Sequence, residues 1–130
     1  MPRWRDHYAK RAKQERYPAR SVYKLKEAQK KYRLIKKGDQ ILDLGCAPGS
    51  WTLYAAKLIG KQGRVVGIDC EAVTHEMPSR AETLMADVMK IDRAWLGDQD
   101  LLNCFDVVLS DMAPATTGNK MVDATRSFQL

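Results

Sequence analysis

The sequence has few cysteines and histidines, and none of them has the spacing of a metal or disulfide site. Its 130 residues include three cysteines, Cys46, Cys70 and Cys104, an odd number without a C-x-x-C pair. The two histidines, His7 and His75, stand alone. This pattern argues against a disulfide framework and a zinc site, and it favours a reducing compartment. We therefore expect no bound metal.

Long apolar runs are also missing. No stretch approaches the roughly 20 apolar residues that a membrane-spanning helix needs. The first ten residues are charged and lack the apolar core of a signal peptide. We expect a cytoplasmic protein without a membrane partner, and 130 residues are enough for one domain with its own core.

The net charge of +6 is unevenly distributed along the chain. Residues 1–40 hold 14 basic and 4 acidic side chains, a net charge of +10, whereas residues 41–130 hold 8 basic and 12 acidic side chains, a net charge of −4. A basic segment attached to a mildly acidic domain suggests a polyanionic partner. Tyrosine and tryptophan alternate with the basic residues there, which suits stacking on bases, although such rings also anchor helices. The alternative is a solvated lysine-rich face without a partner.

The hydrophobic pattern predicts an α/β doubly wound sheet. Short apolar runs predict four strands, at residues 41–44, 64–68, 83–86 and 105–110. Helical spacing predicts a helix that ends at Tyr32, with an apolar stripe of Val22, Leu25, Ala28 and Tyr32. Two further helices are expected, one opened by Ser50 and stopped by Gly60, and one over residues 123–130.

The first predicted strand runs into a glycine-containing turn and a helix, in the stretch I-L-D-L-G-C-A-P-G-S-W at residues 41–51. This arrangement lets a backbone approach a nucleotide-like ligand closely. The dinucleotide fingerprint G-x-G-x-x-G is not met, because Ala47 replaces the middle glycine and the third glycine is absent. Asp43 fits a cation better than a diphosphate. S-adenosylmethionine, a sulfonium without phosphate, is therefore favoured over a dinucleotide.

Acidic residues stand at or near the carboxyl ends of all four predicted strands: Asp43, Asp69, Asp87 and Asp111. Ligands of such sheets bind outside those strand ends. Asp69, at the end of the second strand, is placed to accept hydrogen bonds from both hydroxyls of a ribose. The alternative for Asp69 and Asp87 is that they only cap a turn or a helix.

Three motifs, in this order, resemble the FtsJ-type RNA 2′-O-methyltransferases, and the bacterial branch that acts on a uridine of large-subunit ribosomal RNA is the nearest match. They are R-S-V-Y-K-L at 20–25, D-L-G-C-A-P-G-S-W at 43–51 and S-D-M-A-P at 110–114. The resemblance runs from about residue 6 to residue 130. It implies a Rossmann-like, S-adenosylmethionine-dependent methyltransferase domain over residues 39–130 and a basic, helical, RNA-binding segment over residues 1–38.

The resemblance also implies roles for single residues. Lys24 and Asp111 match two members of a catalytic Lys-Asp-Lys-Glu tetrad, and Asp87 would accept a hydrogen bond from the adenine amino group. The cofactor would further be bordered by Asp43, Gly45, Ala47, Pro48, Gly49, Trp51 and Asp111. Ordinary core packing is the alternative for Trp51. Cys46 is expected to be a small apolar filler, with a nucleophile as the lesser alternative.

The second lysine and the glutamate of the tetrad fall later in the family than Leu130, and Lys120 lies too early to replace the lysine. We therefore expect an incomplete domain that binds cofactor but, as 130 residues alone, transfers little or no methyl. The fourth strand would then lie at the edge of the sheet.

The function expected from the sequence is S-adenosylmethionine-dependent 2′-O-methylation of a ribose in large-subunit ribosomal RNA. A small-molecule methyltransferase is an alternative, and it would not need the basic segment. A second alternative is a module that binds RNA and cofactor without catalysis. A dinucleotide oxidoreductase fits less well because of the broken glycine spacing.

Overall fold

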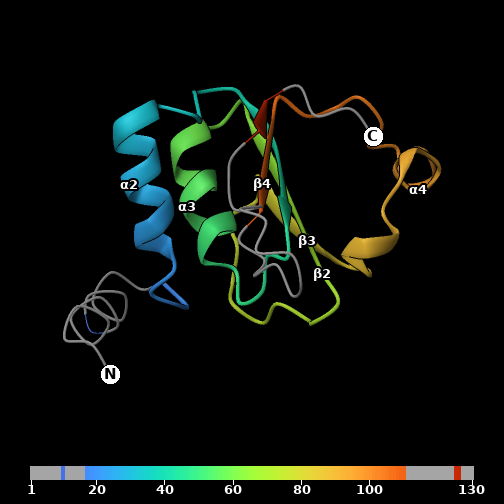
Figure 1. The fold of residues 1–130 in the computed structure, drawn as a ribbon, viewed down its shortest axis with the longest axis horizontal. Helices are drawn as coiled ribbons and strands as arrows, with labels where there is room; N and C mark the ends of the chain where they lie inside the picture. The colour runs from blue at the N-terminus through green and yellow to red at the C-terminus, as the bar shows by residue number, and fades with distance from the viewer. Residues whose placement is uncertain (1–9, 11–16, 111–124, 127–130) are drawn as a thin grey trace, which may run out of the picture.

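A sheet with four parallel strands forms the centre of the fold (Figure 1). The computed structural model describes residues 10, 17–110 and 125–126. In chain order the elements are α2 (Val22–Tyr32), β1 (Gln40–Leu44), α3 (Ser50–Ile59), β2 (Arg64–Asp69), β3 (Ala81–Met85), the short 3-10 helix η1 (Val88–Lys90), α4 (Arg93–Asp98), β4 (Val107–Ser110) and β5 (Thr125–Arg126).

The strand order is β3-β2-β1-β4-β5, with β1 in the middle of the parallel part. The pairs β1–β2, β2–β3 and β1–β4 are parallel, so these strands begin at one edge of the sheet and end at the opposite edge. Helices α2 and α3 lie on one side of the sheet and α4 on the other (Figure 1). The predicted α/β architecture with four strands is therefore confirmed.

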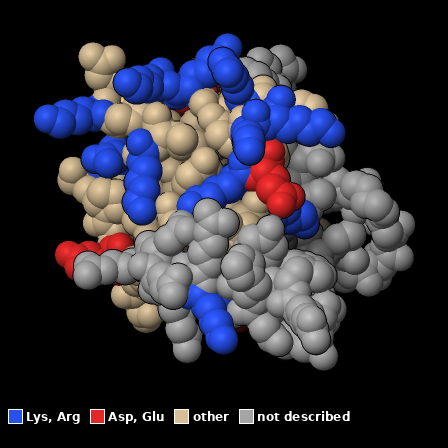
Figure 2. Space-filling view, turned by 90° about the vertical axis from the view of Figure 1, so that its left-hand side faces the viewer, with Lys and Arg blue, Asp and Glu red and all other residues tan. Residues whose placement is uncertain are grey.

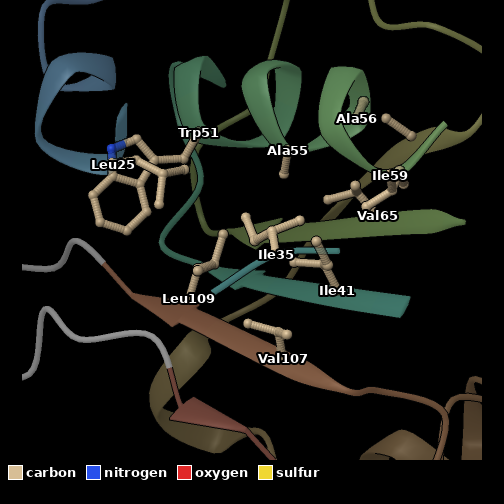
Figure 3. Close-up of a cluster of buried hydrophobic side chains, with 11 residues drawn as sticks. Leu25, Ile35, Ile41, Trp51, Ala55, Ala56, Ile59, Val65, Val107 and Leu109 are labelled. Carbon is tan, nitrogen blue, oxygen red and sulfur yellow. The ribbon is translucent and has the colours of Figure 1, made fainter. Parts of the chain in front are cut away.

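Hydrophobic clusters cover both faces of the sheet. Successive side chains of a strand point to opposite faces. Accordingly, Ile41 packs with α3 in one cluster (Figure 3), while its neighbour Leu42 belongs to the cluster that includes Leu96 of α4. Both side chains are fully buried. The short apolar runs in the sequence, interrupted in β1 by Asp43, therefore reflect strands covered on both sides.

The apolar stripe predicted for α2 holds only over the N-terminal part of the helix. Val22 and Leu25 are buried, but Tyr32 is 62 % exposed, so its assignment to the core was wrong. The buried side chains of α2, which include Tyr23, all lie near the start of the helix, so only that part packs against the rest of the domain. Tyr32 lies at the opposite end, next to Arg33, where the helix ends with a φ of 49°.

Of the residues 123–130 expected to form a helix, the structure describes only 125–126, and these are not helical. Thr125–Arg126 forms β5, which pairs antiparallel with β4 through Val107↔Arg126 and Val108↔Thr125. Pairing satisfies backbone donors and acceptors of β4 that an open edge would leave unpaired. Part of the fourth strand is therefore not at the edge of the sheet.

A cluster of tyrosines and lysines holds α2 against α3. Tyr17 and Tyr23 are buried, and the Nζ of Lys26 lies 5.0 Å and 5.2 Å from the centres of their rings. The same ammonium group lies 5.5 Å from the ring centre of Tyr54 on α3. Such cation–π contacts stabilise the packing of the rings. Tyr17 and Tyr23 therefore anchor the helix, which was the alternative to base stacking; Trp4 and Tyr8 lie outside the described residues.

Candidate functional site

The turn at residues 45–49 joins β1 to α3 at the carboxyl edge of the sheet. The backbone N–H groups of Gly45 and Cys46 both donate to the carbonyl of Ile68 on β2, at 2.8 Å and 3.1 Å. Gly49 is the N-cap of α3, with a φ of 114°. A β-carbon there would lie only 2.5 Å from the Cε of Met77. Glycine is therefore favoured chiefly by its backbone angle, since the flexible end of the Met77 side chain could move away from an added β-carbon.

Asp69, the last residue of β2, joins the turn to that loop. Its Oδ2 accepts from the N–H of Ala47 and its Oδ1 from the N–H of Glu71, both at 2.9 Å. Burial alone would raise the pKa of the Asp69 carboxyl, but the backbone hydrogen bonds from Glu71 and Ala47 outweigh burial and hold the pKa below its ordinary value. The carboxylate is therefore charged at neutral pH, only half buried, and fixed in orientation beside the turn.

Asp43 lies beneath the turn and is only 1 % exposed. Its Oδ2 accepts a hydrogen bond of 2.7 Å from the Oγ1 of Thr52 on α3. Asp43 lines a small pocket together with Gly45, Pro48 and Trp51. Among the described residues, no lysine or arginine lines this pocket. The lining therefore suits a cationic or neutral ligand and offers no partner for a diphosphate.

Ser50 and Trp51 connect the start of α3 to the segment before α2. The Oγ of Ser50 accepts from the N–H of Ala19 at 2.7 Å and donates to the carbonyl of Ala19 at 3.2 Å. The indole Nε1 of Trp51 donates to the carbonyl of Ser21 at 2.9 Å. The expectation that Ser50 caps α3 was therefore wrong. Gly49 is at the cap position, and the hydroxyl of Ser50 bonds to Ala19 instead. The Trp51 ring is 5 % exposed and packs beside Leu25 (Figure 3), the alternative considered for it.

The other predicted site residues are placed around this centre. Asp87 is exposed just after β3, and its Oδ1 accepts from the N–H of Met89 at 2.9 Å, so it does cap η1. Strand β3 ends beside β2, with Met85 paired to Asp69. Lys24 is exposed on α2, and its N–H donates to the carbonyl of Ser21, which lines the pocket. Asp111 lies outside the described residues.

The model of the FtsJ-like methyltransferase family matches residues 17–130, which include the turn, Asp69, Asp87 and Lys24. The chain belongs to this family. Among the curated proteins similar to it are the ribosomal RNA large subunit methyltransferase E of Desulfosudis oleivorans, 55 % identical over 96 % of the chain, and that of Desulforapulum autotrophicum, 52 % identical over 98 %.

The chain spans about three-fifths of the length of these relatives, 59 % and 62 % respectively. A crystal structure described as a ribosomal RNA methyltransferase of Plasmodium falciparum is also similar to the FtsJ-like chain. It is 29 % identical, has a TM-score of 0.61, and the match covers 79 % of this chain and 60 % of that one.

Two features of this FtsJ-like site escaped the sequence argument. Thr52, which hydrogen-bonds Asp43, sits at an ordinary helix position and has no spacing signal of its own. Gly67 of β2 lies so close to the turn that a β-carbon there would meet the Oγ1 of Thr52 at 2.7 Å and the Sγ of Cys46 at 2.9 Å. A glycine inside an otherwise apolar strand was the available clue to this close approach.

Neither a metal site nor a membrane span was found in the part of the chain that the structure describes. No three His, Cys, Asp or Glu side chains lie close enough together there to hold a metal ion. None of the helices in that part is long and apolar enough to cross a membrane.

Cys46 is expected to be chemically inert. Burial raises the pKa of its thiol to about 12, and the nearby carboxylates Asp43 and Asp69 add to the shift. At pH 8 roughly one thiol in 10⁴ would be ionised, and only the thiolate reacts with alkylating agents. Mass spectrometry after iodoacetamide treatment should therefore show labelling of the exposed Cys70 well before Cys46. Cys70→Ser should remove the signal at position 70 and leave those of Cys46 and the partly exposed Cys104 unchanged, and equal labelling rates of Cys46 and Cys70 would contradict the burial of Cys46.

Proposed function

We propose that the chain supplies the cofactor-binding part of an S-adenosylmethionine-dependent 2′-O-methyltransferase. Its substrate would be the ribose of a uridine in large-subunit ribosomal RNA. The observation that carries the proposal is the turn at residues 45–49, held by the charged carboxylate of Asp69 at the carboxyl edge of the sheet. Because the chain belongs to a methyltransferase family, methyl transfer is the reaction that this geometry would serve. The names of the relatives supply the ribosomal RNA substrate.

The residues of the turn fit this cofactor. The pocket lined by Asp43 and the turn carries one carboxylate and no described basic side chain, which suits an ammonium and a sulfonium. The charged Asp69 carboxylate, which accepts from the backbone N–H groups of Ala47 and Glu71, would also accept from ribose hydroxyls. Asp87 would accept from the adenine amino group. When bound, the cofactor supplies a methyl carbon made electrophilic by the positive sulfur.

Gly45, Ala47 and Pro48, which line the pocket, would border the methionine part of the ligand together with Gly49, which follows them in the turn. Trp51 would contribute through its backbone and by fixing the start of α3, since its ring is packed in the core. Nothing in this part of the site needs Cys46 to react.

We further propose that Lys24 and Asp111 act on the hydroxyl of the target ribose. The oxygen must lie in line with the methyl carbon and the sulfur, and its proton must leave before or during attack. In the family a later lysine is the main base, so Lys24 and Asp111 would position the ribose and spread the charge that develops during transfer. Lys24 lies about one helical turn beyond Ser21, which lines the pocket. The basic segment at residues 1–38 would hold the phosphates of the RNA.

Isothermal titration calorimetry tests the cofactor part of the proposal. The purified chain should bind S-adenosylmethionine and its demethylated product, and it should show no measurable binding of NAD, because the pocket has no partner for a diphosphate. Binding of NAD with equal or higher affinity would instead favour a dinucleotide enzyme.

Because the 130 residues alone are expected to transfer little or no methyl, the transfer reaction is tested on a chimera in which the C-terminal part of the Desulfosudis oleivorans relative follows this chain. Large ribosomal subunits and cofactor carrying an isotopically labelled methyl group are the substrates. Nucleoside digestion and mass spectrometry should find the label as a 2′-O-methyl nucleoside, and Lys24→Ala should lower the single-turnover rate by about 10²–10⁴. Lys90→Ala, a lysine exposed on η1, is the matched control and should leave the rate unchanged. Label on a base, or only on small molecules, would contradict the proposed reaction.

A further inference from the structure

The described basic residues do not all gather near the candidate site. In a parallel sheet the starts of the strands share one edge, here called the amino edge, opposite the turn at residues 45–49. Basic side chains precede or begin three strands in a row. They are Lys36 and Lys37 before β1, Lys61 and Arg64 at the start of β2, and Arg80 before β3. These five residues are called the amino-edge basic surface.

Backbone contacts join the turns that carry these residues into one surface. The N–H of Gly38 donates to the carbonyl of Ile59 at 2.8 Å, and the N–H of Arg64 donates to the carbonyl of Asp39 at 3.2 Å. The N–H of Val65 donates to the carbonyl of Arg80 at 2.9 Å. The positions of the basic residues relative to one another are therefore set by the sheet and not only by flexible side chains.

The end of α2 is fixed to the same surface. The side-chain amide of Gln29 accepts from the N–H of Ile35 at 2.9 Å and donates to its carbonyl at 2.8 Å. This contact places the exposed cations at the end of the helix next to the amino edge: Lys30, Lys31 and Arg33. Figure 2 shows lysine and arginine side chains crowding the upper part of the face that α2 covers, the end at which the strands begin in Figure 1.

The acidic groups at this edge are already engaged. Asp39 is buried and accepts from the N–H of Lys36 at 2.9 Å, and Asp106 accepts from the N–H of Gln40 at 2.9 Å. Glu82 forms an ion pair with Arg64. Lys36, Lys37 and Lys61 are all exposed. The five basic side chains outnumber Asp39, Glu82 and Asp106, so the surface carries excess positive charge, and its exposed part comes chiefly from the lysines, because the Nε of Arg80 donates to the carbonyl of Ala56 at 2.6 Å.

The opposite edge has the reverse charge. Asp69 and Glu71 lie at the end of β2, and Asp87 follows β3. Strands of five residues, at about 3.3 Å per residue, separate the two edges by roughly 17 Å. A polyanion is attracted to the amino edge and to α2, and is repelled by the acidic groups around the candidate cofactor site.

We propose that the amino-edge basic surface binds the phosphate backbone of RNA several nucleotides away from the ribose that reacts. The identification of the polyanion as RNA rests on the proposed function. The distribution of basic residues on the protein does not depend on it. Phosphate contacts of this kind fix the register of a nucleic acid without reading its sequence. One strand of RNA would then run along α2 from the candidate site to the far edge of the sheet.

The test compares two doubly substituted chains. Lys36→Gln with Lys61→Gln removes two charges from the amino-edge basic surface, and Lys90→Gln with Arg93→Gln removes two exposed charges beyond β3 as the matched control. Binding of a fluorescein-labelled RNA of about 30 nucleotides is followed by anisotropy over a range of salt concentrations. We expect the first variant to lose about 3- to 30-fold in affinity. Its slope of log K against log salt should become shallower by roughly 1 to 1.5, since each phosphate contact contributes about 0.7.

Lys36→Arg with Lys61→Arg should restore both affinity and slope, because the charges return. Equal slopes for the wild type, the amino-edge variant and the control would overturn the proposal. Binding of polyglutamate is measured on the same variants. If the Lys36→Gln, Lys61→Gln variant lost affinity for polyglutamate but kept its affinity for RNA, the proposal would also be overturned, and an acidic protein would be the indicated partner. Calorimetry with S-adenosylmethionine on the same samples keeps the two proposals apart: absent cofactor binding in the wild type contradicts the proposed function, whereas the RNA slopes alone decide the amino-edge surface.

Discussion

Replacing Asp69 by alanine is expected to weaken the binding of S-adenosylmethionine by about 1–3 kcal/mol, or roughly 5- to 150-fold. Two losses combine in this variant. The ribose hydroxyls proposed to donate to the carboxylate would lose their acceptor, and the N–H of Ala47 would lose the hydrogen bond that fixes the turn. Calorimetry at constant pH measures the change directly.

Asp98→Ala is the matched control, because Asp98 is exposed on α4 on the other side of the sheet. Its cofactor affinity should equal that of the wild type. Asp87→Ala should lower the affinity as well, through the adenine contact. Unchanged affinity in both the Asp69 and the Asp87 variants would contradict the assignment of this edge as the cofactor site.

Asp69 also makes stability depend on pH in one direction. Its pKa is lower in the folded chain than the ordinary value of 3.8. The contribution of the carboxylate to stability is therefore fully present above that value and is lost as the pH falls through the lower folded pKa. Urea unfolding between pH 6 and pH 3 should show a smaller loss of stability for Asp69→Asn than for the wild type. An identical pH dependence for the two chains would contradict the lowered pKa.

Gly67→Val is expected to destabilise the fold by about 3 kcal/mol. Gly67 pairs with Asp43 in the sheet, and even a single added carbon would lie 2.7 Å from the Oγ1 of Thr52 and 2.9 Å from the Sγ of Cys46. Thr52 and Cys46 are both buried, so neither can move away easily. Displacing Thr52 would also break its hydrogen bond to the buried carboxylate of Asp43. The free energy of unfolding in urea measures the loss.

Gly97→Ala provides the comparison. Gly97 lies inside α4 and is exposed, and no heavy atom would come within 4 Å of an added β-carbon. Alanine is favoured over glycine in a helix by roughly 0.5–1 kcal/mol, so this variant should be as stable as the wild type or slightly more stable. If the two glycine variants unfolded at the same urea concentration, the close contact at Gly67 would be contradicted.

The strands and the turn were predictable because their signals are local. The strand containing Ile41 is a short apolar run interrupted only by Asp43, a pattern typical of a strand covered on both faces. Asp69 could be placed at the edge of the sheet because it directly follows such a run. The order of these elements then sufficed to place the candidate site.

What could not be predicted depends on contacts between distant parts of the chain. Helical periodicity marks a possible apolar face, but it does not say where the helix leaves the core, and Tyr32 was misplaced for that reason. Ser50 has the residue type of a helix cap, yet its hydroxyl bonds to Ala19, 31 residues away. Strand β5 has two residues and no apolar run, and only its pairing with β4 defines it.

The hydrogen bonds from Ser50 and Trp51 to Ala19 and Ser21 make the start of α3 and the segment before α2 one cooperative unit. A ligand that orders either part reduces the entropy that the other part must lose when its own ligand binds. Thermodynamic linkage makes that effect reciprocal. With RNA held along α2 as proposed, the factor by which RNA changes the affinity for the cofactor would equal the factor by which the cofactor changes the affinity for RNA.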